Sequence, residues 1–424
     1  MKRLAMLISC IILGFIMLAG CGGNSGASIY PSPESPYVPP LPKPPPEWPV
    51  INGDGALVAL IVEPTLERLI RPSLDQFVDD LIADGYEVVL YISDFTTPIE
   101  LRSYLAGLYD HSGGTLNGAI LIGDFPHAYQ SVALNSSTPN IGTLSEEVIS
   151  FQYYADLNGD FSASSGYISP GGHAYSFNMH RGDVDWEIWI GVLPLYRGNM
   201  AETVNALEHY FAKNHAYRVN GSDFPYAFLQ IDEHLRPESP DQPFTYLPEM
   251  YYGEYAWTPF SSELDAYIYI ESFADGLSLD EGYTALSAGV ANFTVLDAHG
   301  SSGASGRLSI NWIESHPIQT DFFWNTACAS GDLDKAYNVL TSLLYSPTSA
   351  VIVAAGTTAN SGGFGNNENG FYGHNIASAL VNESSIGDAV LAHVNVPLIY
   401  PWSKSREFHF AQQVILGDPT LRIR

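Results

Sequence analysis

The chain contains 424 residues, of which 46 are Asp or Glu and 17 are Lys or Arg, so its formal net charge at pH 7 is −29. Such an acidic surface repels nucleic acid and excludes binding to anionic lipid by charge alone. Hydrophobic residues make up 46% of the chain, which is enough to bury the core of one large domain or two ordinary ones.

Residues 1–20 have the organisation of an export signal. A positively charged start is followed by an almost wholly apolar run over 4–17 and then by small residues. This segment is too short to span a bilayer as a helix. Its end, the tetrapeptide LAGC that closes at Cys21, resembles the bacterial lipobox, in which the cysteine is acylated. We therefore expect lipid on Cys21 to hold the protein at the cell envelope. The residue after this cysteine is Gly22 rather than Asp, which by resemblance to the sorting rules of double-membrane bacteria favours the outer membrane or cell surface.

Residues 21–51 form a proline-rich segment, which we predict to be a spacer between the lipid and the folded body. The prolines between Ala27 and Val50 exclude a helix and favour the extended polyproline conformation, which advances about 3.1 Å per residue. An alternative is that these prolines dock into the aromatic groove of another protein. The folded body is expected to begin near residue 52.

The first part of the body, residues 52–221, alternates apolar runs of strand length with stretches of helical periodicity. The patterns predict strands at Leu57–Val62, Glu87–Ile92, Ala119–Asp124 and Trp186–Gly191, and helices at Thr65–Ala83, Pro98–Tyr109 and Met200–Arg218. Residues 130–182, rich in Ser, Gly, Asn and aromatic residues, are expected to form long loops. The polar turn at Asn220–Asp223 marks a boundary between two subdomains.

The second part, residues 222–424, repeats this rhythm and is the expected catalytic subdomain. It contains predicted strands at Tyr226–Ile231, Val290–Leu296, Asp321–Thr326 and Ala350–Ala355, and a predicted helix at Asp334–Tyr345. Alternation of strands and helices is typical of an α/β fold, so we predict a mostly parallel sheet flanked by helices.

Cys328 is the one cysteine of the body, because Cys10 and Cys21 belong to the leader, so it has no partner for a disulfide. His299 and Cys328 each follow a predicted strand, and parallel sheets present their active sites at the carboxyl edge. A thiol attacks a carbonyl only as thiolate, and a neighbouring imidazole promotes that ionisation. The backbone amides of Gly300 and Cys328 are the expected oxyanion donors. The alternative is a cysteine that merely fills the core and a hydrogen-bonded histidine.

Several motifs resemble the gingipain family of cysteine peptidases, which share the caspase-type fold. They are DAHG at 297–300, CASGD at 328–332, AILIGDFP at 119–126, YYADLNGD at 153–160, IWIGVLP at 188–194 and LGDPTL at 416–421. The resemblance spans roughly residues 56–424 and implies a thiol peptidase with His299 as general base and Cys328 as nucleophile. Val192 departs from the pattern, because arginine is usual at that place.

The resemblance also implies an acidic residue that orients the histidine. Matching the family's strand to residues 228–231 places Glu233 in that role, with Asp232 as a close alternative. Gingipains proper cleave after Arg or Lys through an acidic pocket. Asp232, Asp241 and Asp275 are the candidates for such a pocket here, so the residue preferred before the cut stays open.

Asp156, Asn158 and Asp160 place oxygen atoms at alternate positions around a glycine turn, as a calcium loop does. Members of the family carry structural calcium, so we expect that a calcium ion could bind here, with a plain Asx-type turn as the alternative. The glycine-rich stretch 361–370 is expected to be either a wall of the substrate cleft or a surface loop. The sequence has no His-Glu-x-x-His or Gly-x-Ser-x-Gly motif, which disfavours a zinc peptidase or a serine hydrolase.

These observations together predict a lipid-anchored extracytoplasmic cysteine endopeptidase of gingipain type that acts on protein or peptide substrates. It needs no organic cofactor, does not bind nucleic acid, and contacts the membrane through its lipid anchor. The competing hypothesis is an inactive binding or scaffold lipoprotein with the same caspase-like fold.

Overall fold

The structure is a computed structural model that describes residue 48 and residues 55–134, 144–233, 266–271, 279–359, 380, 384–395 and 410–423. Within these ranges, no helix combines the length and the apolar character that a bilayer crossing requires. The predictions for residues 1–20, for lipid on Cys21, for Asp241 and Asp275 and for the stretch 361–370 lie outside the described residues. So does the predicted spacer, apart from Trp48.

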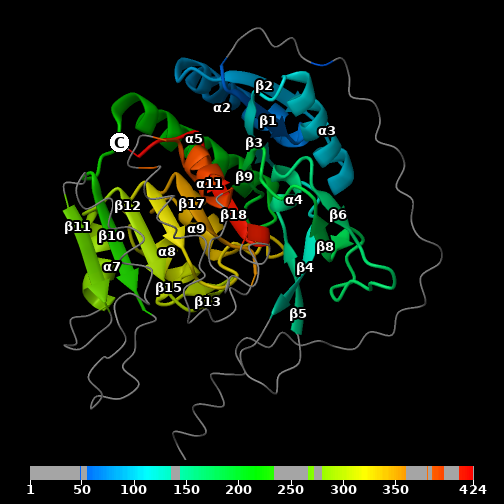
Figure 1. Cartoon of the computed structure of the whole chain (residues 1–424). Coiled ribbons are helices and arrows are strands. Elements are labelled where there is room, and N and C mark those ends of the chain that lie inside the picture. Colours follow the sequence, from blue (N-terminus) through cyan, green and yellow to red (C-terminus); the bar gives the residue numbers. More distant parts are fainter. Residues whose placement is uncertain are drawn as a thin grey trace, which may run out of the picture. The chain divides into compact units, whose positions relative to one another are not determined.

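One large sheet forms the centre of the fold (Figure 1). Its strands are β1 (Leu57–Val62), β2 (Glu87–Ile92), β3 (Leu116–Ile122), β9 (Trp189–Leu193), β10 (Ala227–Asp232), β11 (Ala266–Glu271), β12 (Phe293–Asp297), β16 (Phe322–Asn325), β17 (Val353–Thr357) and β18 (Gln413–Gly417). The strand order in this 10-stranded sheet is β11-β10-β12-β16-β17-β18-β9-β3-β1-β2. Neighbours pair in parallel except β17 and β18, which are antiparallel. The predicted mostly parallel α/β fold is therefore confirmed.

Helices cover the sheet, as the alternating sequence pattern predicts. They are α2 (Pro64–Ala83), α3 (Pro98–His111), α5 (Met200–Asn220), α7 (Leu279–Ala288), α8 (Ile310–Ser315), α9 (Val339–Tyr345) and α11 (Ile386–Val394). Helix α5 packs against α2 and α9, and α9 packs against β17 and β18. All residues of β1 are fully buried, as expected for a parallel strand covered on both faces.

The region 130–182 is more ordered than the predicted long loops. It contains β4 (Tyr129–Leu134), β5 (Leu144–Ile149), α4 (Gln152–Ala155), β6 (Asp160–Ser162), β7 (Ser176–Phe177) and β8 (Met179–Arg181). The prediction was wrong because β6, β7 and β8 have only two or three residues each, and because β4 and β5, which have six, mix apolar residues with Gln, Ser and Glu, which hides their periodicity. Val132 and Val148 of the β4–β5 pair form a small buried cluster with Ala359 and Ala411.

One further prediction for the second half needs correction, and one ordered segment was not predicted. The helix predicted at Asp334–Tyr345 begins only at Val339, because Asn338 forms a capping box with Thr341: the Thr341 amide donates to the Asn338 side chain at 2.9 Å, and the Asn338 amide donates to the Thr341 hydroxyl at 3.1 Å. The stretch after His299 was not predicted to be ordered. It folds into a three-stranded sheet of β13 (Gly300–Ser301), β14 (Ala304–Ser305) and β15 (Leu308–Ser309).

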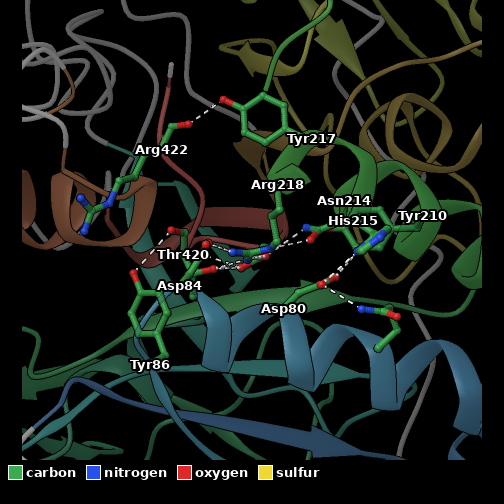
Figure 2. Close-up of polar contacts among 12 residues, drawn as sticks. Asp80, Asp84, Tyr86, Tyr210, Asn214, His215, Tyr217, Arg218, Thr420 and Arg422 are labelled. Atoms are coloured by element: carbon green, nitrogen blue, oxygen red, sulfur yellow. Dashed lines mark hydrogen bonds and ion pairs between the residues drawn. The ribbon is translucent and has the colours of Figure 1, made fainter. Parts of the chain in front are cut away.

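Helix α5 connects elements from both halves of the chain through polar side chains (Figure 2). Arg218 donates to the carboxylates of Asp84 and Asp418 and, at 2.6 Å, to the hydroxyl of Thr420. Asn214 also donates to Asp418, at 3.0 Å. The segment that follows β18 is thereby fixed to the end of α2, so the two predicted subdomains share one sheet and one network.

Candidate active site

The parallel register of β12 and β16 places the His299 and Cys328 turns next to each other. Leu296 pairs with Asn325, and the Thr326 amide extends this ladder by donating to the Leu296 carbonyl at 3.0 Å. The chain leaves β12 after Asp297 and β16 after Asn325, so the turns that carry His299 and Cys328 lie side by side at the carboxyl edge of the sheet. His299 is exposed, whereas Cys328 is 8% exposed.

Gly300 brings the two turns into contact. A Cβ atom at Gly300 would lie 2.6 Å from the Cβ of Ala327 and 2.7 Å from the carbonyl oxygen of Ala304. These distances are shorter than any carbon side chain tolerates, so the absence of a side chain at Gly300 lets the turn after β12 rest directly on the residue before Cys328.

The hairpin that begins at His299 also sets the direction of the Gly300 amide. The Gly306 amide donates to the His299 carbonyl at 2.7 Å, and Gly300 pairs with Ser305 in the antiparallel β13–β14 ladder. Hydrogen-bonded and non-hydrogen-bonded pairs alternate along such a ladder, so Gly300–Ser305 is a non-hydrogen-bonded pair. The Gly300 N–H therefore points away from β14.

Cys328 lies on a tight turn that β17 holds in place. Ala329 has a φ of 52°, a left-handed conformation that is uncommon without glycine and that persists only where surrounding contacts impose it. Those contacts are present: the Ala329 amide donates to the Ala359 carbonyl at 2.7 Å, and the Thr357 hydroxyl donates to the Ala327 carbonyl at 3.0 Å.

Glu233 follows β10 and contacts the hairpin that begins at His299. Its carboxylate accepts hydrogen bonds from the Tyr283 hydroxyl and, at 3.1 Å, from the Arg307 amide. It also packs against Gly306, whose φ of 55° and missing side chain leave room for it. Burial raises the pKa of Tyr283, and the charge of Glu233 raises it further. The structure thus brings Glu233 together with the hairpin that carries His299.

Asp232 is the last residue of β10, and the register places it between Glu271 on β11 and Asp297 on β12. It therefore shares the carboxyl edge of the sheet with the His299 turn. That Asp232 lines the substrate pocket stays a prediction.

The proposed calcium loop is occupied by protein contacts. The fully buried carboxylate of Asp156 lies 2.6 Å from Nε2 of His180 and accepts the Gly159 amide at 2.5 Å. Asn158 donates to Glu187 at 2.5 Å. Over the described residues, no group of three or more His, Cys, Asp or Glu side chains is arranged to hold a metal ion. Asp156, Asn158 and Asp160 do not form a cation shell as they are arranged here, and calcium binding stays a prediction.

A cavity of about 240 Å³ lies between the turns after β3 and β9 and the segment that follows Cys328. Its lining includes Asp124, His127, Asp334 and Lys335, and neither His299 nor Cys328 contributes to it. Tyr129 donates to Asp334 at 2.6 Å, a contact that fixes β4 against the chain after Cys328. Nothing in the sequence pattern indicated this pairing.

Comparison with solved structures identifies the fold. The chain is similar to the crystal structure of the Arg specific cysteine proteinase gingipain R, with a TM-score of 0.60, 14% sequence identity, and coverage of 89% of this chain and 80% of that chain. It is also similar to a structure described as a protease, with a TM-score of 0.57, 12% identity, and coverage of 88% and 79%. No protein-family model and no curated protein matches the sequence. The chain therefore has the caspase-like fold of the gingipains, which confirms at the level of the fold the resemblance drawn from its motifs.

Proposed function

We propose that this protein is a lipid-anchored extracytoplasmic cysteine endopeptidase with Cys328 as nucleophile and His299 as general base. The register of β12 and β16 carries the proposal, because it brings these two turns together at the edge where parallel sheets present their active sites. The gingipain-like fold supports the same conclusion, since both similar structures are proteases.

In this mechanism His299 takes the proton of the Cys328 thiol, and the thiolate attacks the carbonyl carbon of the scissile peptide bond. The amides of Gly300 and Cys328 donate to the oxyanion that forms. The carbon–nitrogen bond then breaks, and His299 returns its proton to the leaving amine. Water attacks the resulting thioester, which releases the carboxylic acid and restores the thiol.

Alkylation of Cys328 and peptide hydrolysis test this function together. Iodoacetamide, followed by peptide mapping, should modify Cys328 of the native protein near neutral pH much faster than it modifies free cysteine. His299→Ala should slow both reactions by at least about a hundredfold. His316→Ala is the matched control, because His316 is an exposed histidine stacked on Trp312 and should be dispensable. Hydrolysis of peptides by Cys328→Ala would refute the mechanism.

The anchor and the substrate pocket are separate parts of the proposal. Cys21→Ser should move the protein from the membrane fraction to the soluble fraction without changing hydrolysis of a small peptide, and a variant that stays with the membrane would contradict the anchor.

Gingipain R is described as Arg specific. A peptide library that varies the residue before the cut, tested on wild type and on Asp232→Asn and Asp241→Asn, would identify the carboxylate that selects it.

A further inference from the structure

Asn325 is the last residue of β16, and its buried side chain forms hydrogen bonds on both sides. Its Nδ2 donates to the hydroxyl of Ser305 at 2.9 Å, and its Oδ1 accepts the Ala327 amide at 3.0 Å. Both Asn325 and Ser305 are fully buried. Water therefore cannot replace either contact, and each partner left alone would be an unsatisfied buried polar group.

The two partners of Asn325 belong to the two turns of the candidate site. Ser305 pairs across the β13–β14 ladder with Gly300, the residue that follows His299 in the sequence. Ala327 directly precedes Cys328 and contacts Gly300. One amide side chain therefore cross-links the His299 hairpin to the Cys328 turn, in addition to the contact between Gly300 and Ala327.

We propose that Asn325 is a positioning residue that fixes the distance between His299 and Cys328 by holding Ser305 and Ala327 at once. This inference rests on the proposed function and extends it to a residue that touches neither substrate nor sulfur. A primary amide fits the position because one rigid group carries an acceptor for the Ala327 amide and a donor for the Ser305 hydroxyl.

Two other contacts of the Cys328 turn are independent of Asn325. Thr357 donates to the Ala327 carbonyl, and the Ala359 carbonyl accepts the Ala329 amide. Both partners lie on or just after β17 and not on the hairpin. Loss of the Asn325 amide should thus leave the turn itself folded, while the hairpin that carries His299 loses the link that Asn325 makes between Ser305 and that turn.

Four variants separate positioning from general stability. Asn325→Leu removes both hydrogen bonds at similar volume. Asn325→Asp keeps two acceptor oxygens, and the Ser305 hydroxyl can rotate to donate to one of them. Ser305→Ala removes the hairpin end of the link, and a double variant combines it with Asn325→Leu. Asn214→Ala is the matched control, because Asn214 is a fully buried amide that bonds to Asp418 away from the site.

The measurements are kcat and KM for a peptide, and the pH at which alkylation of Cys328 reaches half its maximal rate. For Asn325→Leu we expect kcat to fall at least about tenfold with KM within about twofold, and the alkylation midpoint to move up by about one pH unit or more. Ser305→Ala should show the same changes at smaller size, and the double variant should be no worse than Asn325→Leu. Asn325→Asp should restore kcat to within about threefold of wild type.

The outcomes distinguish this inference from the function on which it rests. If wild type neither hydrolyses peptides nor alkylates rapidly at Cys328, the proposed function is wrong and the positioning role falls with it. If wild type does both while Asn325→Leu keeps the wild-type kcat and alkylation midpoint, the function stands and the positioning role is wrong. The same holds if Asn214→Ala shifts the midpoint as far as Asn325→Leu, because the change would then report destabilisation alone.

Discussion

At the scale of single residues, the glycines of the β13–β14 hairpin differ sharply in what surrounds them. A side chain on Gly300 would collide with Ala327, whereas nothing lies within 4 Å of the position that a side chain on Gly303 would take. The hairpin therefore needs one of its glycines for close approach to the Cys328 turn and tolerates replacement of the other.

Gly300→Ala should push the hairpin away from the Cys328 turn. The added methyl group overpacks a contact that is already closed, so we expect a loss of about 1–3 kcal/mol in the free energy of unfolding and a fall of at least about tenfold in kcat. Gly303→Ala is the control and should change kcat by less than about twofold. Equal activity of the two variants, measured with one peptide, would contradict the close-approach argument.

Glu233→Gln should separate the charge of this residue from its contacts. A glutamine oxygen can still accept from Tyr283 and Arg307, so the hairpin should stay in place and the unfolding free energy should change by less than about 1 kcal/mol. Loss of the negative charge beside the His299 hairpin should lower kcat by about tenfold, because a cationic imidazole would be less stabilised. The exposed Glu281 gives the control, Glu281→Gln. An unchanged pH profile of kcat/KM in Glu233→Gln would argue against an orienting role.

The sequence was sufficient to select His299, Cys328 and Gly300 as candidates because each carries a local signal: a strand end, the one cysteine outside the leader, or a glycine after a histidine. Asn325 and Tyr283 carry no such signal. Their importance depends on the register between β12 and β16 and on the packing of α7 near β10, which only the folded chain defines.

At the scale of elements, apolar runs and helices with a clear period were predictable, and strands that are very short or rich in polar residues were not. β1 and α2 match their predicted bounds within about two residues. The pairs β4–β5 and β13–β14 depend on contacts with Ala359, Ala411 and Ala327 that are distant in sequence. Their order comes from tertiary packing, which the composition of these stretches does not reveal.

Helix α11 carries a buried histidine that should make stability depend on pH. His393 is 6% exposed, and neither ring nitrogen has a hydrogen-bond partner among the described residues. Burial lowers its pKa to about 4. The unfolded chain gains a proton on this residue below about pH 6.5, and the native state gains it only near pH 4. His393 therefore lowers the free energy of unfolding as pH falls from about 6.5 to about 4, by about 3 kcal/mol in total.

His393→Phe should remove that cost and keep the edge contact with Phe410. Urea unfolding of wild type and variant at several pH values between 4 and 8 gives the measurement. The unfolding free energy of the variant relative to wild type should rise by about 3 kcal/mol from pH 7 to pH 4. A difference that stays constant over this range would mean that His393 is protonated in the native state as easily as in the unfolded one.

At the scale of the whole molecule, the C-terminal strand joins the two halves of the sheet. β18 lies between β17 of the second half and β9 of the first half, and one buried apolar cluster includes residues from both. The following residues, Asp418 and Thr420, contact Arg218 on α5, which also holds Asp84 at the end of α2 (Figure 2). The halves should therefore unfold as one cooperative unit.

Asp418→Asn tests this cooperativity. Asp418 is fully buried and the Arg218 side chain is 4% exposed, so the substitution removes one of the two carboxylates that neutralise a buried guanidinium. We expect the free energy of unfolding to fall by about 3–5 kcal/mol. Asp75→Asn is the control, because the Arg71–Asp75 pair is about half exposed and should contribute less than about 1 kcal/mol.

Tryptophans of both halves, Trp189 on β9 and Trp324 on β16, should report one shared transition in wild type and in Asp418→Asn, at a lower urea concentration in the variant. Two separated transitions would show that the halves unfold independently and that β18 does not couple them.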